Sequence, residues 1–333
     1  MYSKNRADGR SLCMPQKGCK SLYYALLTFI GLLTLAGCQA QPSKSDSLNQ
    51  ANSSEMTIPN PHFDGDRAMK LLVQQCDFGP RPVGSPAHIK TRDFLLTEMK
   101  KYADVVQTQD FTYRGMPLTN IIGVFNPKAK KSILFCTHWD TRPTADEEID
   151  PAKRKMPIPG ADDGASGTAV LLEMARDFHY NRPKVGVILL LIDGEDYGDF
   201  EMNQGVFLGS RYFAAHHKGY DPEYGVLIDM IGAKNLKIHK EYNSQKYAPQ
   251  VDDKVFNLAK EMGYSKYFID SVKYNIGDDH LPLIQAGIPT IDLIDFDYAP
   301  WHTLADTPDK CSPQSLAIVG NVLEALTYQE NPN

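Results

Sequence analysis

The sequence has few cysteines, no excess of positive charge and no long hydrophobic run. Its 333 residues include six cysteines, and no two of them form a Cys-x-x-Cys pair. Neither a disulfide framework nor a cysteine-based zinc site is therefore predicted. The formal net charge is −6 at pH 7, and an acidic surface argues against nucleic acid as a partner. The sequence has no internal repeat, so a solenoid fold is not predicted.

The one sustained apolar run lies near the N-terminus. It spans residues 22–37 and follows Lys17 and Lys20, and it is short for a membrane span. The run closes on the segment 35–38, Leu-Ala-Gly-Cys, which resembles the lipobox of bacterial lipoproteins. That resemblance implies cleavage before Cys38 and a lipid on its thiol. A plain signal peptide or an uncleaved anchor is the alternative.

The lipobox sets the boundaries that we expect for the rest of the chain. Residues 1–37 form a lipoprotein signal peptide, and their loss leaves 30 basic and 40 acidic residues, a net charge of about −10. Residues 38–60 are polar and rich in Ser, Asn, Gln and Pro, as is typical of a flexible tether. Residues 61–333 are then expected to form the folded domain. The segment before the apolar run is long, so translation starts at Met1 or Met14. We expect a lipid-anchored protein of the cell envelope that faces the periplasm or the cell surface.

Hydrophobic periodicity beyond residue 61 alternates between helix and strand patterns. Helices are predicted over 66–76, 91–102, 165–179, 250–262 and 313–328, and strands over 105–113, 118–125, 132–137, 185–193, 224–229 and 289–295. The continuous apolar run in 185–193 is typical of a central strand covered on both faces. This alternation predicts an α/β fold: a single layered domain with a central, mostly parallel or mixed β-sheet flanked by helices.

Acidic and histidine side chains gather where the predicted strands end. Taken singly, each has an ordinary explanation, such as a hydrogen-bonded loop histidine or an acidic pair at a helix N-terminus. Together they lie at the edge where open α/β sheets bind ligands. Converging carboxylates and imidazoles would pay for desolvation and repulsion, and a zinc ion with mixed nitrogen and oxygen ligands removes that cost. These residues are His138, Asp140, Asp162, Asp163, Asp193, Glu195, Asp196, Asp229 and His302.

The order and spacing of these groups resemble the zinc aminopeptidase family and its glutaminyl cyclase relatives. The motifs read His138-Trp139-Asp140, Gly160-Ala161-Asp162-Asp163-Gly164-Ala165-Ser166-Gly167, Asp193-Gly194-Glu195-Asp196, Leu227-Ile228-Asp229 and Trp301-His302-Thr303. The resemblance runs from about Phe78 to the last predicted helix, and it implies the zinc-aminopeptidase-like version of the α/β fold.

Several local features are closer to the cyclases than to the peptidases. They are the runs 137–143, 157–164, 229–232 and 278–282, together with the Trp directly before the late His. Two departures stand against them. Animal cyclases have Glu-Glu where this chain has Glu195-Asp196, and no Trp follows Glu195 closely, so we expect Phe200 to take its place in the pocket.

Carried over by motif, the resemblance implies one zinc ion per chain, held by Asp163, Asp196 and His302. Glu195 then transfers a proton from the substrate α-amine to the departing amide nitrogen, because a single carboxylate can act as base and then as acid. Asp229 and Asp278 would form a carboxylate network that grips the substrate amine.

Trp301 and Phe200 would wall the substrate pocket. The implied activity is the conversion of an N-terminal Gln of peptides or proteins into pyroglutamate, with release of ammonia. The partners are then peptide substrates and, through Cys38, a membrane. The sequence carries no signal for oligomeric state, and we expect a monomer.

Two other functions stay open at this point. In a two-zinc aminopeptidase, His138 and Asp229 would hold a second zinc and Asp163 would bridge, whereas in a cyclase His138 is structural and held by a carboxylate such as Asp140. An inactive peptide-binding lipoprotein would be expected to have lost Glu195 or a ligand, and none is missing.

Overall fold

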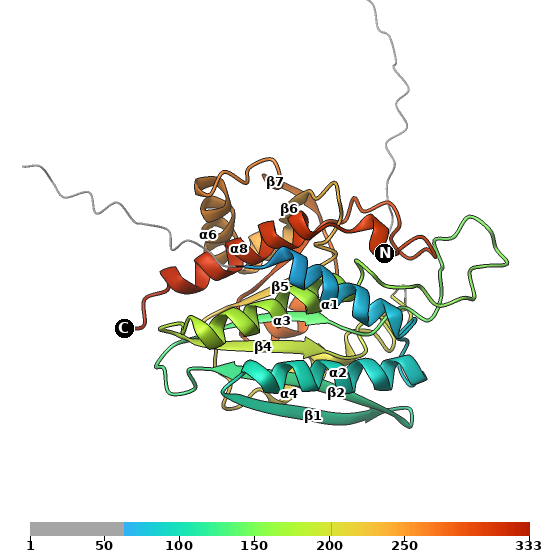
Figure 1. Ribbon diagram of the computed structural model, residues 1–333, viewed down its shortest axis with the longest axis horizontal. Coiled ribbons are helices and arrows are strands. Elements are labelled where there is room, and N and C mark those ends of the chain that lie inside the picture. The colour runs from blue at the N-terminus through green and yellow to red at the C-terminus, as the bar shows by residue number, and fades with distance from the viewer. Residues whose placement is uncertain (1–62, 201) are drawn as a thin grey trace, which may run out of the picture. The chain divides into compact units, whose positions relative to one another are not determined.

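The computed structural model describes residues 63–200 and 202–333, so the predicted signal peptide and tether lie outside the described residues. A six-stranded sheet crosses the middle of the domain in the order β1-β2-β4-β3-β5-β8 (Figure 1). Its strands are β1 (Val105–Tyr113), β2 (Met116–Phe125), β3 (Ser132–His138), β4 (Gly186–Ile192), β5 (Gly225–Asp229) and β8 (Thr290–Ile294). β1, β2 and β4 pair antiparallel, and β4, β3, β5 and β8 pair parallel. The predicted mixed α/β sheet is confirmed.

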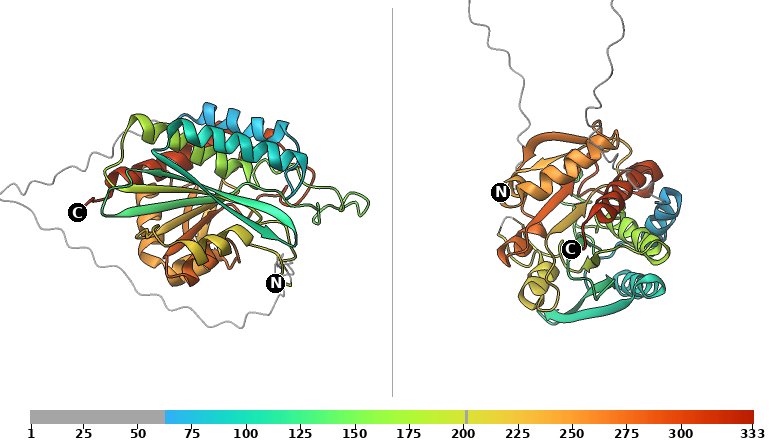
Figure 2. Two further views of the ribbon diagram at one scale, coloured as in Figure 1. Left: turned by 90° about the horizontal axis from the view of Figure 1, so that it is seen from below. Right: turned by 90° about the vertical axis from the view of Figure 1, so that its left-hand side faces the viewer.

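Helices cover both faces of this sheet (Figure 2). One face carries α1 (Gly65–Asp77), α2 (Pro86–Tyr102), α3 (Ala165–Tyr180) and α8 (Pro313–Gln329), and the other carries α4 (Leu208–His216) and α7 (His280–Gln285). β4 shows why its run is apolar throughout: Val187, Leu189 and Leu191 belong to the core under α3, while Ile188 and Leu190 belong to the core under α4 and α7.

A smaller unit packs beside β8 and α8. It consists of a two-stranded parallel sheet of β6 (Ile238–Glu241) and β7 (Phe268–Tyr274), with α5 (Tyr242–Tyr247) and α6 (Pro249–Glu261). Sequence periodicity predicts only α6 here. The two strands are short and their register shifts between His239 and Glu241, so alternation is interrupted. α4 also goes unpredicted, because it opens at Phe207 in a left-handed conformation (φ 56°) without a side-chain cap.

Helix boundaries follow capping residues that periodicity alone does not weigh. α2 begins at Pro86 and not at residue 91, because the Ser85 side chain accepts a hydrogen bond from the His88 backbone and Pro86 occupies the first turn. α8 begins in the same way at Ser312 and Pro313.

The helix α3 lies unusually close to the sheet at Gly167. A Cβ atom there would come within 2.1 Å of the Thr137 side-chain oxygen and 2.9 Å of the Ile228 carbonyl oxygen. Because only glycine fits, the loop before α3 is held directly against the carboxyl ends of β3 and β5.

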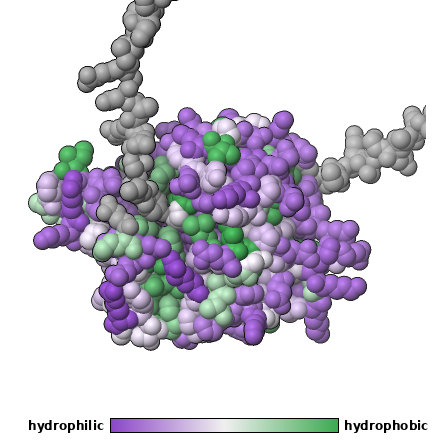
Figure 3. Space-filling view, turned by 180° about the vertical axis from the view of Figure 1, so that it is seen from behind, coloured by the Kyte–Doolittle hydropathy of each residue, from purple (hydrophilic) through white to green (hydrophobic). Residues whose placement is uncertain are grey.

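Other surface and cysteine features are simple. The face in Figure 3 is mostly hydrophilic, with apolar residues in a few small groups. Cys76, Cys136 and Cys311 are free thiols. Within residues 63–200 and 202–333, none of the helices has the length and apolar character needed to cross a membrane.

Candidate active site

A cavity of about 260 Å³ opens at the edge where the parallel strands end. His138 closes β3, Asp229 closes β5, and the loop after β4 carries Glu195 and Asp196. The structure brings together the residues to which the sequence assigns a catalytic, substrate-binding or metal-binding role, because each of them lines this cavity: Asp163, Glu195, Asp196, Phe200, Asp229, Asp278, Trp301 and His302.

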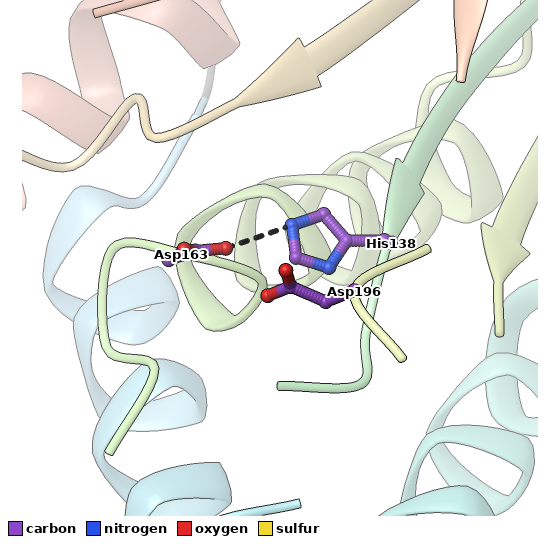
Figure 4. A group of neighbouring side chains, drawn as sticks. All are labelled: His138, Asp163 and Asp196. Atoms are coloured by element: carbon purple, nitrogen blue, oxygen red, sulfur yellow. Dashed lines mark ion pairs between the residues drawn. The ribbon is translucent and has the colours of Figure 1, made fainter. Parts of the chain in front are cut away.

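The two carboxylates Asp163 and Asp196 lie between two imidazoles. His302 Nε2 is 3.7 Å from Asp163 Oδ2 and 3.7 Å from Asp196 Oδ1. On the other side, His138 Nε2 is 3.2 Å from Asp163 Oδ1. The ligand atoms of His138, Asp163 and Asp196 all lie within 4.8 Å of one another (Figure 4). His138, Asp163 and Asp196 therefore form a group that could hold a divalent cation, and His302 lies close to the same two carboxylates.

The chemistry of this cluster fits a bound zinc ion. All four side chains are buried, and Asp196 Oδ2 has no hydrogen-bond partner although it is shielded from solvent. Burial and the charge of Asp163 raise the pKa of Asp196 to about 7. A bound cation would offset both the burial of the Asp196 carboxylate and its repulsion from Asp163. Two carboxylates with an imidazole nitrogen are ligands that zinc accepts.

The remaining carboxylates form an acidic group beside this cluster. Burial and the neighbouring Asp196 raise the pKa of Glu195 well above its usual range. Burial likewise raises the pKa of Asp229, and burial with the Asp229 charge raises the pKa of Asp278 far above the ordinary value. Such groups exchange protons near neutral pH more readily than exposed carboxylates do.

His138 contacts other carboxylates more closely than Asp140. Its Nε2 is 3.1 Å from Asp229 Oδ1, whereas its Nδ1 is 3.8 Å from Asp140 Oδ1. Burial opposes protonation, but the contacts with Asp140, Asp163 and Asp229 raise the pKa of His138 well above its usual range.

Asp140 instead holds the loop after β4. Its carboxylate accepts hydrogen bonds from the backbone N–H groups of Gly194, Glu195 and Asp196, at 2.9, 3.1 and 3.3 Å. This buried carboxylate therefore sets the positions of both Glu195 and Asp196.

Asp306 performs the same task for the loop before α3. It accepts hydrogen bonds from the backbone N–H groups of Asp162 and Asp163, at 2.9 and 3.2 Å, and from the Tyr298 hydroxyl at 2.7 Å. Sequence reasoning missed Asp306, because it lies far along the chain from the loop that it positions.

Arg142 and Asp146 are the other residues that sequence reasoning missed. The buried Arg142 guanidinium hydrogen-bonds Asp146 at 2.8 Å, lies 3.4 Å from Asp196 Oδ1, and stands 4.7 Å over the ring of Phe200. Asp146 Oδ1 is in turn 3.2 Å from His302 Nδ1. A carboxylate that holds the second nitrogen of a histidine is the usual support of a metal-binding imidazole. The only sequence signal was the position of Arg142 in the run 137–143.

Trp301 and Phe200 supply the apolar walls of the cavity. The Trp301 ring stacks on His302 with centroids 3.9 Å apart, and the Phe200 ring lies 6.3 Å from the same imidazole. His302 itself has a left-handed backbone (φ 54°), which is uncommon for a residue with a side chain and marks a constrained position.

Comparisons with known proteins place the chain in a family. Residues 120–327 match the model of peptidase family M28. The solved glutaminyl cyclase of Tannerella forsythia is 35% identical, with a TM-score of 0.78 and coverage of 81% of this chain and 100% of that one. The glutaminyl cyclase of Bacteroides thetaiotaomicron bound to N-acetylhistamine is 36% identical, with a TM-score of 0.77 and coverage of 81% and 99%.

A curated animal relative is more distant. The glutaminyl-peptide cyclotransferase of Bos taurus is 23% identical over 288 residues, which cover 74% of this chain and 77% of that protein. The family model spans more than half of the chain, and the bacterial structures exceed 30% identity over most of it. The chain therefore belongs to peptidase family M28, among its zinc aminopeptidase-like members that include the bacterial glutaminyl cyclases.

Proposed function

We propose that this chain is a zinc-dependent glutaminyl-peptide cyclotransferase, which converts the N-terminal Gln of peptides and proteins into pyroglutamate and releases ammonia. The observation that carries the proposal is one cavity in which Glu195, Asp229 and Asp278 lie beside a cluster that fits zinc. Its relatives named as glutaminyl cyclases, bacterial and animal, support the same activity.

The reaction needs a folded-back substrate and two proton transfers. The α-amine has a reference pKa near ~8, so much of it is protonated at neutral pH and must lose a proton before it attacks. The neutral amine then attacks. Glu195 accepts the proton that the α-nitrogen loses as the new bond forms, and gives it to the amide nitrogen, which leaves as ammonia. The new bond joins the α-nitrogen to the side-chain amide carbon, Cδ, and the bond from Cδ to the amide nitrogen breaks.

The other cavity residues hold the substrate for this ring closure. Asp229 and Asp278 hydrogen-bond the α-amine and hold it near the side-chain amide carbon, Cδ, which orients the intramolecular attack. Trp301 and Phe200 pack on the glutamine side chain and exclude water. Zinc, when bound by Asp163, Asp196 and His302, supplies a Lewis acid for the γ-amide carbonyl.

The proposed metal content is one zinc ion per chain. His138 Nε2 lies within 3.2 Å of carboxylate oxygens of both Asp163 and Asp229. In this proposal the imidazole links those two carboxylates and leaves Asp229 to hydrogen-bond the substrate amine. In the competing aminopeptidase, His138 and Asp229 would hold a second zinc instead.

Mass spectrometry of a Gln-initiated peptide tests the proposed activity directly. We expect a product that is lighter by one ammonia, and no change in a matched peptide that begins with Ala. Loss of the N-terminal residue from both peptides would instead identify an aminopeptidase. Heat-inactivated protein controls for spontaneous cyclisation.

We further propose that the mature protein is a monomer attached to a membrane of the cell envelope by a lipid on Cys38. The Leu-Ala-Gly-Cys segment supports the anchor, and the polar stretch 38–60 would let the catalytic domain reach soluble peptides.

A further inference from the structure

Two carboxylates at the cavity wall stand apart from the groups that the proposed reaction uses. Glu147 is exposed and Asp199 is half-buried, and both line the cavity. Among the ion pairs of residues 63–200 and 202–333, neither carboxylate has a cationic partner. Arg142, the nearby guanidinium of the cavity wall, is already engaged by Asp146 and Asp196.

Both residues are held in place by backbone hydrogen bonds. The Glu147 N–H donates to the carbonyl oxygen of His302 at 3.2 Å, which attaches this segment to the loop of the predicted metal ligand. Asp199 exchanges backbone hydrogen bonds with Gln204 at 2.9 and 3.0 Å, and its side chain accepts one from the Met202 N–H at 2.9 Å. The backbone is therefore anchored at both residues, and a further hydrogen bond holds the Asp199 carboxylate.

The path of a bound peptide brings its second residue past these charges. The carboxylates that receive the α-amine in the proposed reaction, Asp229 and Asp278, line the cavity and are buried. The rest of the peptide must leave toward solvent, where Glu147 is exposed. A long cationic side chain at the second position can reach this rim, whereas an acidic one is repelled.

We propose that Glu147 and Asp199 determine specificity, by favouring N-terminal Gln peptides whose second residue is Lys or Arg over those with Asp or Glu. This inference rests on the proposed cyclase function. It differs from a general effect of the acidic protein, because it assigns the preference to two positions at the mouth.

The test compares kcat/KM for peptides that begin Gln-Lys, Gln-Ala and Gln-Glu and are otherwise identical. The variant is Glu147→Gln with Asp199→Asn. Its matched control is Asp221→Asn with Glu223→Gln, which removes the same charge from exposed residues just before β5, at the opposite edge of the sheet from Asp229.

We expect wild type and control to prefer Gln-Lys over Gln-Glu on the order of tenfold at low ionic strength, and the preference to shrink as salt screens it. In the Glu147→Gln/Asp199→Asn variant the preference for Gln-Lys over Gln-Glu should fall to about twofold, since the remaining preference comes from the overall charge of the protein. The inference would be overturned if the Glu147→Gln/Asp199→Asn variant kept the wild-type ratio of kcat/KM for Gln-Lys over Gln-Glu. It would also be overturned if this ratio fell equally in the control variant. Failure of wild type to cyclise any Gln peptide would instead remove the proposed function.

Discussion

Glu195 and Asp196 are neighbours in the chain with the same charge, yet their surroundings differ. Asp196 faces Arg142 at 3.4 Å and His302 at 3.7 Å. Glu195 lies near other acidic side chains. Burial is the main cause of its raised pKa, and the charges of Asp196 and Asp278 raise it further. The Arg142 guanidinium favours an ionised Asp196 and offsets part of the effect of burial and Asp163, which still raise its pKa to about 7. The acidic neighbours of Glu195 instead favour its uptake of a proton.

The first prediction follows for Glu195. Glu195→Gln keeps the shape and hydrogen-bonding capacity of the side chain but cannot take up the proton. We expect turnover of a Gln peptide to fall roughly 10²–10⁴-fold, the usual worth of general acid–base catalysis, with zinc content unchanged. Glu223→Gln, an exposed position away from the cavity, serves as the control. Near-normal turnover in Glu195→Gln would exclude it as the proton carrier.

The second prediction separates the two histidines beside Asp163. His302→Ala removes one of the three proposed ligands, so zinc and activity should be lost together. His138→Ala should leave the zinc content unchanged and lower activity through loosened packing. Elemental analysis of both variants measures this. Two zinc ions per wild-type chain, with one lost in His138→Ala, would favour the aminopeptidase.

At the scale of elements, the third prediction concerns the contact between α3 and the sheet. Gly167→Ala places a methyl group against the Ile228 carbonyl oxygen, which is backbone and cannot rotate away. We expect a destabilisation of about 1–3 kcal/mol, typical of overpacking. Zinc affinity should fall as well, because the loop that carries Asp163 moves with α3. An unchanged Tm and zinc affinity would show that the contact is not tight.

Sequence patterns predicted the strands of the main sheet to within a few residues. β3, β4, β5 and β8 are short apolar runs, and burial on both faces imposes that composition. β6, β7, α4, α5 and α7 carry no such signature, because short or bulged elements depend on packing with neighbours for their shape.

The sequence likewise predicted one part of the candidate site and missed another. Motifs located every group that lines the cavity as a proposed ligand, proton carrier or wall. They did not find the contacts of Arg142 with Asp146 or of Asp306 with the loop at Asp163, since these depend on segments that meet only in the folded chain. Glu147 and Asp199 also looked like ordinary loop residues.

At the scale of the whole molecule, the fourth prediction is that zinc stabilises the fold. Any ligand that binds only the native state at about 100 times its Kd adds about 2.7 kcal/mol. For a domain of this size, we expect chelation to lower Tm by about 5–10 °C, with recovery on adding zinc but not magnesium. Differential scanning fluorimetry measures the shift, and an identical Tm after verified metal removal would contradict it.

The fifth prediction concerns the proposed anchor, which lies outside the described residues. Cys38→Ser removes the thiol that would carry lipid, so the protein should move from the membrane fraction to the soluble fraction. Immunoblotting of fractionated cells measures this, and Cys76→Ser controls for loss of a cysteine elsewhere. A Cys38→Ser protein that still sediments with membranes would place the attachment in another segment.

The strand order of the sheet has a consequence for how the protein folds during its synthesis. The proposed ligands are Asp163, Asp196 and His302, so His302 is synthesised well after the other two. β4 is inserted between β2 and β3, and β8 completes the edge beside β5. A nascent or C-terminally truncated chain therefore lacks the native set of ligands. We therefore expect zinc to be bound by all three proposed ligands only after the segment that carries His302 has been added and has folded beside β5 and β8.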